Sequence, residues 1–190
     1  MGVPMASVIA AIASAGVAIG LALQGALSNF AGCIMILLFH PFRVGDYIEV
    51  GGFSGTVDDI DVFYTFLKTP DNKSVTVPNG SIMSNSVVNY SVNGTRRVDL
   101  NIGVAYGSDI DRVKAILLEE GSRHELVLKD AEPFCRLTTQ GDSSLTFVLR
   151  LWTETANYWQ VNFDVLESIH KRLEAEGIEI PFPQIDVHMK

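Results

Sequence analysis

No Asp, Glu, Lys or Arg precedes Arg43, and residues 3–39 are almost entirely apolar. A helix needs about 20 apolar residues to cross a bilayer, and this segment is longer. It lacks a positively charged start, and it exceeds the ~7–15-residue apolar core of a secretory signal. The sequence therefore predicts a membrane-spanning helix within residues 1–40. At ~1.5 Å per residue, such a helix exceeds a hydrocarbon core of about 30 Å, so we expect tilt, a kink, or a second part that lies along the membrane interface.

Two positions are expected to shape this helix. Gly25 shortly precedes Ser28 and Asn29, so polarity rises there, and we expect a kink at Gly25. Pro41 lacks a backbone N–H and disfavours helical geometry at His40. The helix is therefore expected to end at His40.

Small residues mark two faces of the predicted helix. Every fourth position is small along one row, which is Ala10, Ser14, Ala18, Ala22 and Ala26. Gly16 and Gly20 form a second row with GxxxG spacing. Helices in lipid associate by close packing through small residues, so two small faces predict neighbours on two sides. A ring of identical helices fits this pattern, as do a tightly packed monomeric bundle and a simple GxxxG dimer.

Val17 and Leu21 lie four residues apart and share one helix face. In a ring this face would point at the axis and form two apolar constrictions, which can block ions by dewetting. In the other arrangements these side chains would be ordinary lipid or core contacts.

Charge and chemistry argue against several classes of function. The net charge is −8, and the largest basic cluster is Arg96-Arg97, so no nucleic-acid partner is expected. Cys33 and Cys135 lie far apart in the sequence, which is typical of a reducing compartment rather than of a disulfide framework. The four histidines are scattered without metal-ligand spacing. We therefore expect no metal, no cofactor and no enzymatic activity.

Residues 41–92 predict a small β domain, in which residues 46–90 are expected to form only strands and turns. β-branched and aromatic runs occur at 47–50, 56–57, 63–68 and 75–77. Turn-forming groups such as Gly51-Gly52 and Pro78-Asn79-Gly80 separate the runs. Several short strands at this spacing favour a barrel or a sandwich.

Residues 93–180 predict an α+β domain in the order βαββα, a ferredoxin-like arrangement. Strands are expected at 98–104, 134–138 and 145–152. A capping box at residues 108–111 should open the first helix, with Ile110, Val113, Ile116 and Leu117 facing inward. The second helix should begin near Tyr158 and close at Gly177, and its inward residues are Val161, Val165, Leu166, Ile169 and Leu173.

The tail, residues 181–190, combines the extended Pro181-Phe182-Pro183 with one alternating strand at 185–189. A lone short strand has no partners for its backbone groups. Two outcomes are open: strands of several copies pair around an axis, or the tail frays into solvent.

The ordered motifs resemble those of the small-conductance mechanosensitive channel family (MscS-type), over essentially the whole chain. They are GVAIGLALQG at 16–25, LSN at 27–29, PFRVGD at 41–46, GTV at 55–57, VPNG at 77–80, GVAY at 103–106, SDID at 108–111 and PFPQ at 181–184.

This resemblance implies a homoheptamer in the bacterial inner membrane, in contact with lipids and permeating ions, with most of the chain in the cytoplasm. The pore helix would kink at Gly25 and carry gate rings at Val17 and Leu21. Helix packing would set Ala10, Ser14 and Ala18 against Ala13, Gly16 and Gly20. The family also implies an Sm-like β domain, an α+β vestibule with side portals, and a C-terminal inter-subunit β-barrel. Its portal positions, which bias ion selectivity, would be Arg96, Arg97 and Asp99.

The sequence departs from the family pattern in four places. Val17 is smaller than the usual leucine, Cys33 occupies a position that is often glycine, and His40 replaces a basic residue. In the family, further membrane helices precede the pore helix, sense lipid tension and press on positions that match Leu23 and Leu27. These helices are not within the 190 residues, so we expect the chain to be a part of a longer protein or a truncated form.

The expected function is that of a tension-gated, weakly selective channel subunit that releases ions and small solutes on hypoosmotic shock. Two other classes stay open. One is a membrane-anchored oligomeric cage that binds a ligand or partner without conducting, and the other is an enzyme that uses the vestibule as a chamber.

Overall fold

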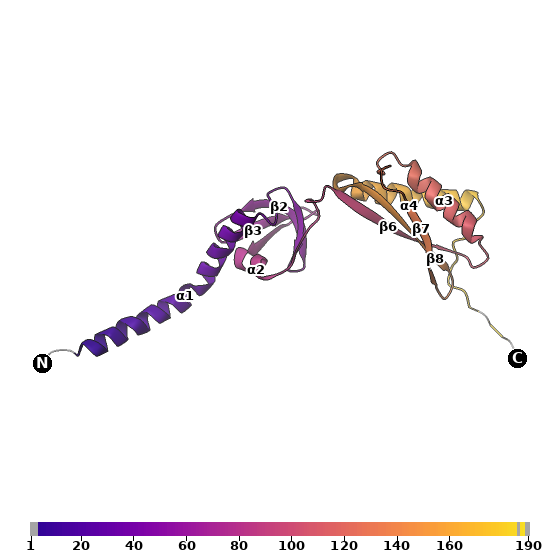
Figure 1. The fold of residues 1–190 in the computed structure, drawn as a ribbon. Coiled ribbons are helices and arrows are strands. Elements are labelled where there is room, and N and C mark those ends of the chain that lie inside the picture. Colours follow the sequence, from indigo (N-terminus) through magenta and orange to yellow (C-terminus); the bar gives the residue numbers. More distant parts are fainter. Residues whose placement is uncertain (1–3, 186, 189–190) are drawn as a thin grey trace. The chain divides into compact units, whose positions relative to one another are not determined.

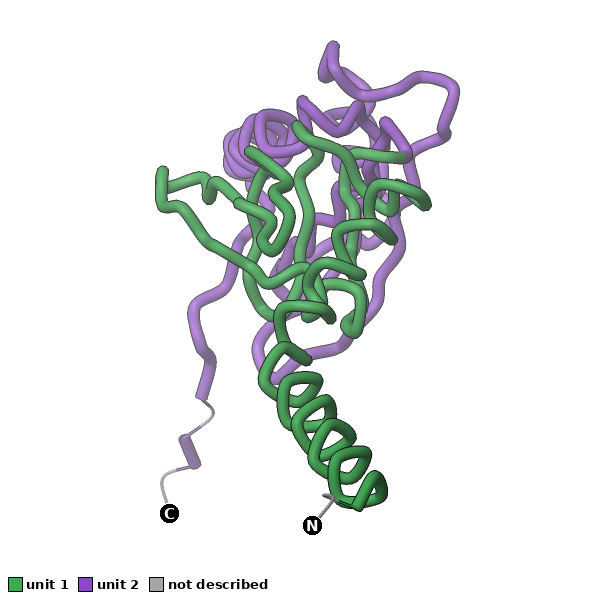
Figure 2. The backbone as a smooth tube through the Cα atoms, turned by 90° about the vertical axis from the view of Figure 1, so that its left-hand side faces the viewer, with its two compact units in different colours: residues 1–92 green, residues 93–190 purple. Residues whose placement is uncertain are grey.

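The computed structural model describes residues 4–185 and 187–188, and the chain divides into two compact units. The first unit is Met1–Val92 and the second is Asn93–Lys190 (Figure 2). Each unit is built around its own core of buried apolar side chains.

The first unit begins with one long helix, α1 (Met5–Phe39), whose ribbon changes direction along its course (Figure 1). Its 35 residues correspond to about 50 Å at 1.5 Å per residue, more than a bilayer core requires. Among the described residues, α1 is the one helix long and apolar enough to span a membrane. The helix continues through Gly25 without interruption, and the kink expected there stays a prediction.

The predicted end of the helix is confirmed. His40 takes a left-handed conformation with φ of 47°, and its N–H donates to the Ile36 carbonyl at 2.9 Å. This backbone turn satisfies one of the unpaired carbonyls at the helix end. Pro41 then prevents the chain from continuing as helix.

The β domain forms a five-stranded antiparallel sheet in the order β4-β3-β2-β1-β5. Its strands are β1 (Tyr47–Val50), β2 (Phe53–Ile60), β3 (Tyr64–Lys68), β4 (Ser74–Pro78) and β5 (Val87–Asn89). Gly51 and Gly52 both have positive φ and connect Val50 to Phe53, as a two-residue type I′ hairpin requires. The core includes Ile48, Leu67 and, from the end of α1, Ile36.

The prediction that residues 46–90 are entirely β was wrong at one place. Residues expected to form a turn begin a short helix, α2 (Asn79–Ser84), which packs against α1. Asn, Gly and Ser are poor helix formers, so local propensity does not favour this helix. It is held by tertiary contacts, since Ile82 is fully buried in the domain core.

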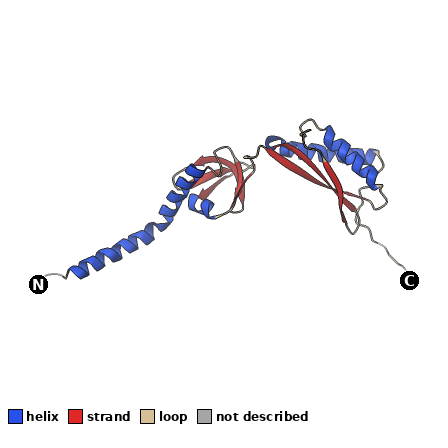
Figure 3. Ribbon diagram, in the orientation of Figure 1, coloured by secondary structure: helices blue, strands red, loops and turns tan. Residues whose placement is uncertain are grey.

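The second unit has the predicted order βαββα (Figure 3). Its elements are β6 (Thr95–Val104), α3 (Ile110–Arg123), β7 (Phe134–Gln140), β8 (Leu145–Glu154), the 3₁₀ turn η1 (Thr155–Asn157) and α4 (Tyr158–Ala175). The sheet order is β6-β8-β7, with β8 antiparallel to both neighbours, which is the split-βαβ arrangement. Helices α3 and α4 cover the same face of the sheet (Figure 1).

Helix α4 ends as the sequence predicts. Gly177 has φ of 68°, the Ile178 N–H donates to the Leu173 carbonyl at 2.9 Å, and the Gly177 N–H donates to the Glu174 carbonyl at 3.1 Å. These two bonds define a Schellman motif.

Two residues, Ile110 and Leu166, were wrongly predicted to lie in the core, because both are exposed. Leu166 directly follows the buried Val165 and so lies about 100° further around the helix.

The helix cap of α3 lies one residue later than the capping box suggests. Asp109, rather than Ser108, is the N-cap, and one of its carboxylate oxygens accepts from the N–H groups of Asp111 and Arg112 at 2.9 and 3.1 Å.

Replacing Asp109 with alanine should destabilise the second unit by about 0.5–2 kcal/mol, since two N–H groups of the first turn lose their acceptor. Ser108→Ala is the matched control, and it should change stability by only a few tenths of that amount. Thermal unfolding followed by circular dichroism measures both. An equal loss in the two variants would contradict the assignment of Asp109 as the cap.

The described part of the tail, residues 181–185 and 187–188, contains no strand. Positions 186 and 189 of the predicted strand lie outside the described residues. Just before the tail, the Ala105 N–H donates to the Glu179 carbonyl at 2.9 Å, which fixes that segment beside the end of β6. Pairing of tails between copies stays a prediction.

Candidate functional site

Val17 and Leu21 lie on the long helix, and neither is covered by this chain. Their exposed fractions are 64% and 67%. Both are part of α1, and their four-residue spacing places them on one face, one turn apart. Two large apolar side chains are therefore available at the same face for contact outside the chain.

Small residues flank Val17 on both sides. At about 100° per residue, Ala10, Ser14 and Ala18 lie to one side of Val17, and Ala13, Gly16 and Gly20 lie to the other. A methyl group placed on Gly16 or Gly20 would meet nothing within 4 Å. The Ser14 hydroxyl donates to the Ala10 carbonyl at 2.8 Å, so this polar group is satisfied within its own helix. Both flanks can thus accept a closely packed neighbouring helix.

Leu23 and Leu27 form a second exposed row on α1. They are four residues apart and turned away from Val17 by roughly 80–120°. Their side chains therefore point in a different direction from that of Val17.

The last turns of α1 pack tightly on the β domain. A methyl group at Gly32 would lie 2.6 Å from the Asn79 carbonyl carbon and 2.8 Å from the Gly80 nitrogen, both backbone atoms of α2. Cys33 and Ile36, further along the same part of the helix, are buried. The two helices approach closely here because Gly32 has no side chain.

Hydrogen bonds add a polar connection at the same junction. The Gly80 N–H donates to the Asn29 side-chain oxygen at 2.9 Å. The buried Asn79 side chain donates to the Asp61 carbonyl and accepts from the Thr65 hydroxyl, each at 2.8 Å. These bonds connect α1 to α2 and, through Asn79, connect α2 to strand β3 and the loop before it.

The three residues predicted to line a portal do not lie together. Arg97 donates two hydrogen bonds to Asp99, at 2.6 and 2.9 Å, and this contact raises the pKa of the Arg97 guanidinium above its ordinary value. Arg96 lies on the opposite face of β6, stacked 3.7 Å above the Tyr158 ring. Side chains alternate across a strand, so neighbouring residues cannot share a face. Arg150 of β8 lies 3.5 Å from Asp99 on the Arg97 face.

Sequence reasoning did not assign roles to Gly32, Asn29 and Asn79 at the junction. A polar Asn29 within an apolar helix and the VPNG motif were visible signals. Nothing in the sequence connects them, because Asn29 and Gly80 are 51 positions apart. Only the fold brings them together.

Comparison with known proteins identifies the family. Residues 25–92 match the mechanosensitive ion channel β-domain, and residues 98–180 match the MscS C-terminal domain of mechanosensitive ion channels. The chain belongs to the MscS family of mechanosensitive channels, which are membrane proteins and not enzymes.

The chain is similar to a small-conductance mechanosensitive channel of Edwardsiella ictaluri, with 46% identity over 93% of this chain and 62% of that protein. It also resembles the crystal structure of Helicobacter pylori MscS in the closed state, with 35% identity and a TM-score of 0.93. That match covers 100% of this chain and 75% of the other. Arabidopsis thaliana MSL1 shares the fold at 22% identity and a TM-score of 0.77, over 93% of this chain and 66% of that one.

Proposed function

We propose that this chain forms the pore and the cytoplasmic vestibule of a tension-gated, weakly selective channel that releases ions and small solutes on hypoosmotic shock. One observation carries the proposal. Val17 and Leu21 are exposed on a membrane-length helix, and small residues flank Val17 on both sides. Identical helices packed through these small faces would direct the two apolar side chains toward a common axis.

The gate works by dewetting. Rings of Val17 and Leu21 side chains narrow the axis to an apolar constriction from which water is excluded, so ions cannot pass. Tension that separates the helices widens the constriction and lets water enter. Leu23 and Leu27 receive the force from preceding membrane helices, and Gly25 is the point at which the helix kinks.

The assembly is a homoheptamer in the bacterial inner membrane, with its bulk in the cytoplasm. Arg43, the first charged residue, follows α1 and is the first of the positive charges expected on the cytoplasmic side. The Arg97–Asp99 pair, with Arg150 beside it, supplies the portal charges that bias ion selectivity. Tails of neighbouring copies pair into a C-terminal β-barrel, which satisfies their backbone groups.

Native mass spectrometry of the full chain in mild detergent tests the ring. A single dominant species of seven times 20.7 kDa is expected. Gly20→Leu should reduce this species, because a bulky side chain on a small face prevents close helix packing. Ile19→Leu, a volume-conserving change on the same helix, is the control. A spectrum containing only monomer and dimer of the parent chain would refute the heptamer.

A further inference from the structure

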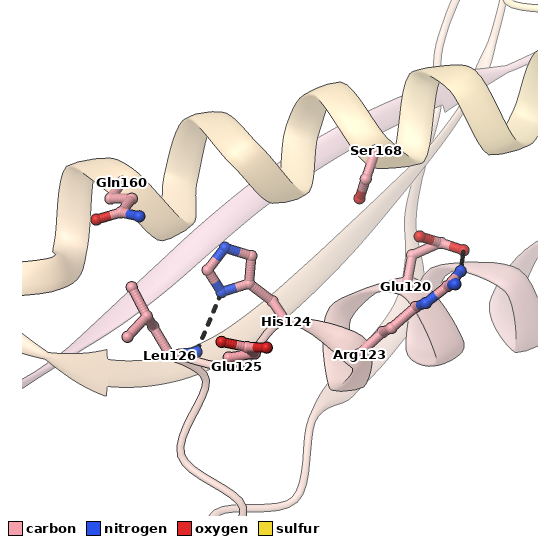
Figure 4. A pocket seen from close by; sticks show the side chains of 7 residues that line it. All are labelled: Glu120, Arg123, His124, Glu125, Leu126, Gln160 and Ser168. Carbon is pink, nitrogen blue, oxygen red and sulfur yellow. Dashed lines mark hydrogen bonds and ion pairs between the residues drawn. The ribbon is translucent and has the colours of Figure 1, made fainter.

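The second unit contains a cavity, lined mostly by polar residues, between the C-terminal end of α3 and the helix α4 (Figure 4). Its volume is about 520 Å³, within the usual range for small-molecule sites. It is lined by Glu120, Arg123, His124, Glu125, Leu126, Gln160 and Ser168. No residue of this group contributes to the proposed pore, the portal or the junction of α1 with the β domain.

Glu120 is the unusual member of the lining. It lies on the inner face of α3 with Val113 and Leu117, and only 7% of it is exposed. Its one charged partner is Arg123, at 3.7 Å, which is beyond hydrogen-bond distance. Within the described residues, no group donates a hydrogen bond to this carboxylate. Its oxygen atoms are therefore reached from the cavity, where a ligand with N–H groups can donate to them.

The neighbouring His124 does not meet this need. Its Nδ1 accepts from the Leu126 N–H at 3.2 Å, so the neutral ring carries its proton on Nε2. Nε2 lies 3.2 Å from a carboxylate oxygen of Asp164 on α4. Figure 4 shows the His124 ring extending toward α4, between Gln160 and Ser168. Both ring nitrogens are thus engaged.

Helix α4 adds a polar stripe with four-residue spacing, Gln160, Asp164 and Ser168. The Ser168 hydroxyl donates to the Val165 carbonyl at 3.0 Å, which leaves its oxygen able to accept from a ligand. The carboxylates of Glu120 and Glu125 line the cavity, and that of Asp164 lies beside it against His124. The one lining guanidinium belongs to Arg123, whose side chain is 73% exposed. The cavity is therefore negative and rich in acceptors.

The geometry points to a binding site for a small organic cation with several N–H donors, such as a primary polyamine. An ammonium group would donate to the Glu120 carboxylate and to acceptors on α4, replacing the distant Arg123 as its partner. Such charge-assisted hydrogen bonds are stronger than those between neutral groups. The bound cation would connect the end of α3 to α4.

Isothermal titration of the full chain in detergent with spermidine, at fixed ionic strength, tests the site. We expect one site per chain and a raised unfolding temperature. Glu120→Gln should weaken binding at least tenfold. Glu132→Gln removes one negative charge from an exposed position outside the cavity and should leave the affinity unchanged. Spermidine with every nitrogen converted to a quaternary methylammonium group keeps all the positive charges but has no N–H donors, and it should not bind.

Several results would refute the proposed binding site. One is no binding of spermidine by the parent chain. Another is equal weakening in the two glutamate variants, and a third is equal binding of the quaternised spermidine. Each of these would indicate only general attraction to an acidic protein. If Glu120→Gln does not fold, Asp164→Asn replaces it, and unchanged affinity in that variant would likewise contradict the site. These measurements involve no conductance, so they are independent of the proposed channel function.

Discussion

Replacing Leu21 with serine is expected to produce a channel that opens at much lower membrane tension, or that leaks at rest. Burying one leucine side chain contributes about 1.5–3 kcal/mol relative to exposure, and the proposed ring repeats the change in every copy. A hydroxyl at each position also lets water remain in the constriction, so the closed state loses its barrier to ions. Val17→Asn should act in the same direction but less strongly, because valine narrows the axis less than leucine does.

Patch recording of the chain, with the family's preceding membrane helices fused upstream, measures the tension threshold and the resting current. Ile19→Ser is the matched control. Ile19 is as exposed as Leu21 and lies on the same helix, but it is turned about 200° from Val17. It should leave both quantities near those of the parent channel. Unchanged threshold and conductance in Leu21→Ser and Val17→Asn would show that the gate lies elsewhere.

Gly32→Ala is expected to destabilise the first unit by about 1–3 kcal/mol, the usual range for overpacking. The added methyl would lie 2.6 Å from the Asn79 carbonyl carbon, and backbone atoms of α2 cannot move aside as a flexible side chain does. Helix α1 must shift instead, which lengthens the bond from the Gly80 N–H to Asn29. A melting temperature lower by several degrees should accompany the change.

Gly25→Ala is the control for this effect. No atom lies within 4 Å of a methyl group at Gly25, and glycine inside a helix is less stable than alanine by roughly 0.5–1 kcal/mol. This variant should therefore be at least as stable as the parent. Hydrogen exchange of the Gly80 amide provides a second measurement, and faster exchange is expected only in Gly32→Ala. Equal protection in both variants would contradict the close packing at Gly32.

Much of the fold could be predicted from local signals. Pro41 ends α1, Gly51-Gly52 forms the hairpin and Gly177 closes α4, because each position depends on backbone chemistry within a few residues. Helix α2 could not be predicted in this way. Its six residues form a helix because Ile82 and Asn79 are buried by strands and by α1, which local propensity does not record.

The candidate site, too, could be predicted only where local sequence patterns determine it. The shared face of Val17 and Leu21 follows from helical periodicity alone. The prediction grouped Arg96 with Arg97 and Asp99, although strand alternation places Arg96 on the opposite face, where the structure has it. The bond between Asn29 and Gly80 depends on how α1 packs against the β domain, which no periodicity specifies. Glu120 falls on the buried face of α3 by its spacing, but only the packing of α4 shows that it borders a cavity.

The two open small-residue faces of α1 also have a genetic consequence. In a ring, each copy touches two others, so one defective copy disturbs the helices on both sides of it. When a cell makes altered and normal chains in equal amounts and they mix at random, only about one ring in a hundred of the proposed seven-copy kind is free of altered chains. Gate and packing variants of this chain should therefore behave as dominant alleles in a cell that also carries the normal gene.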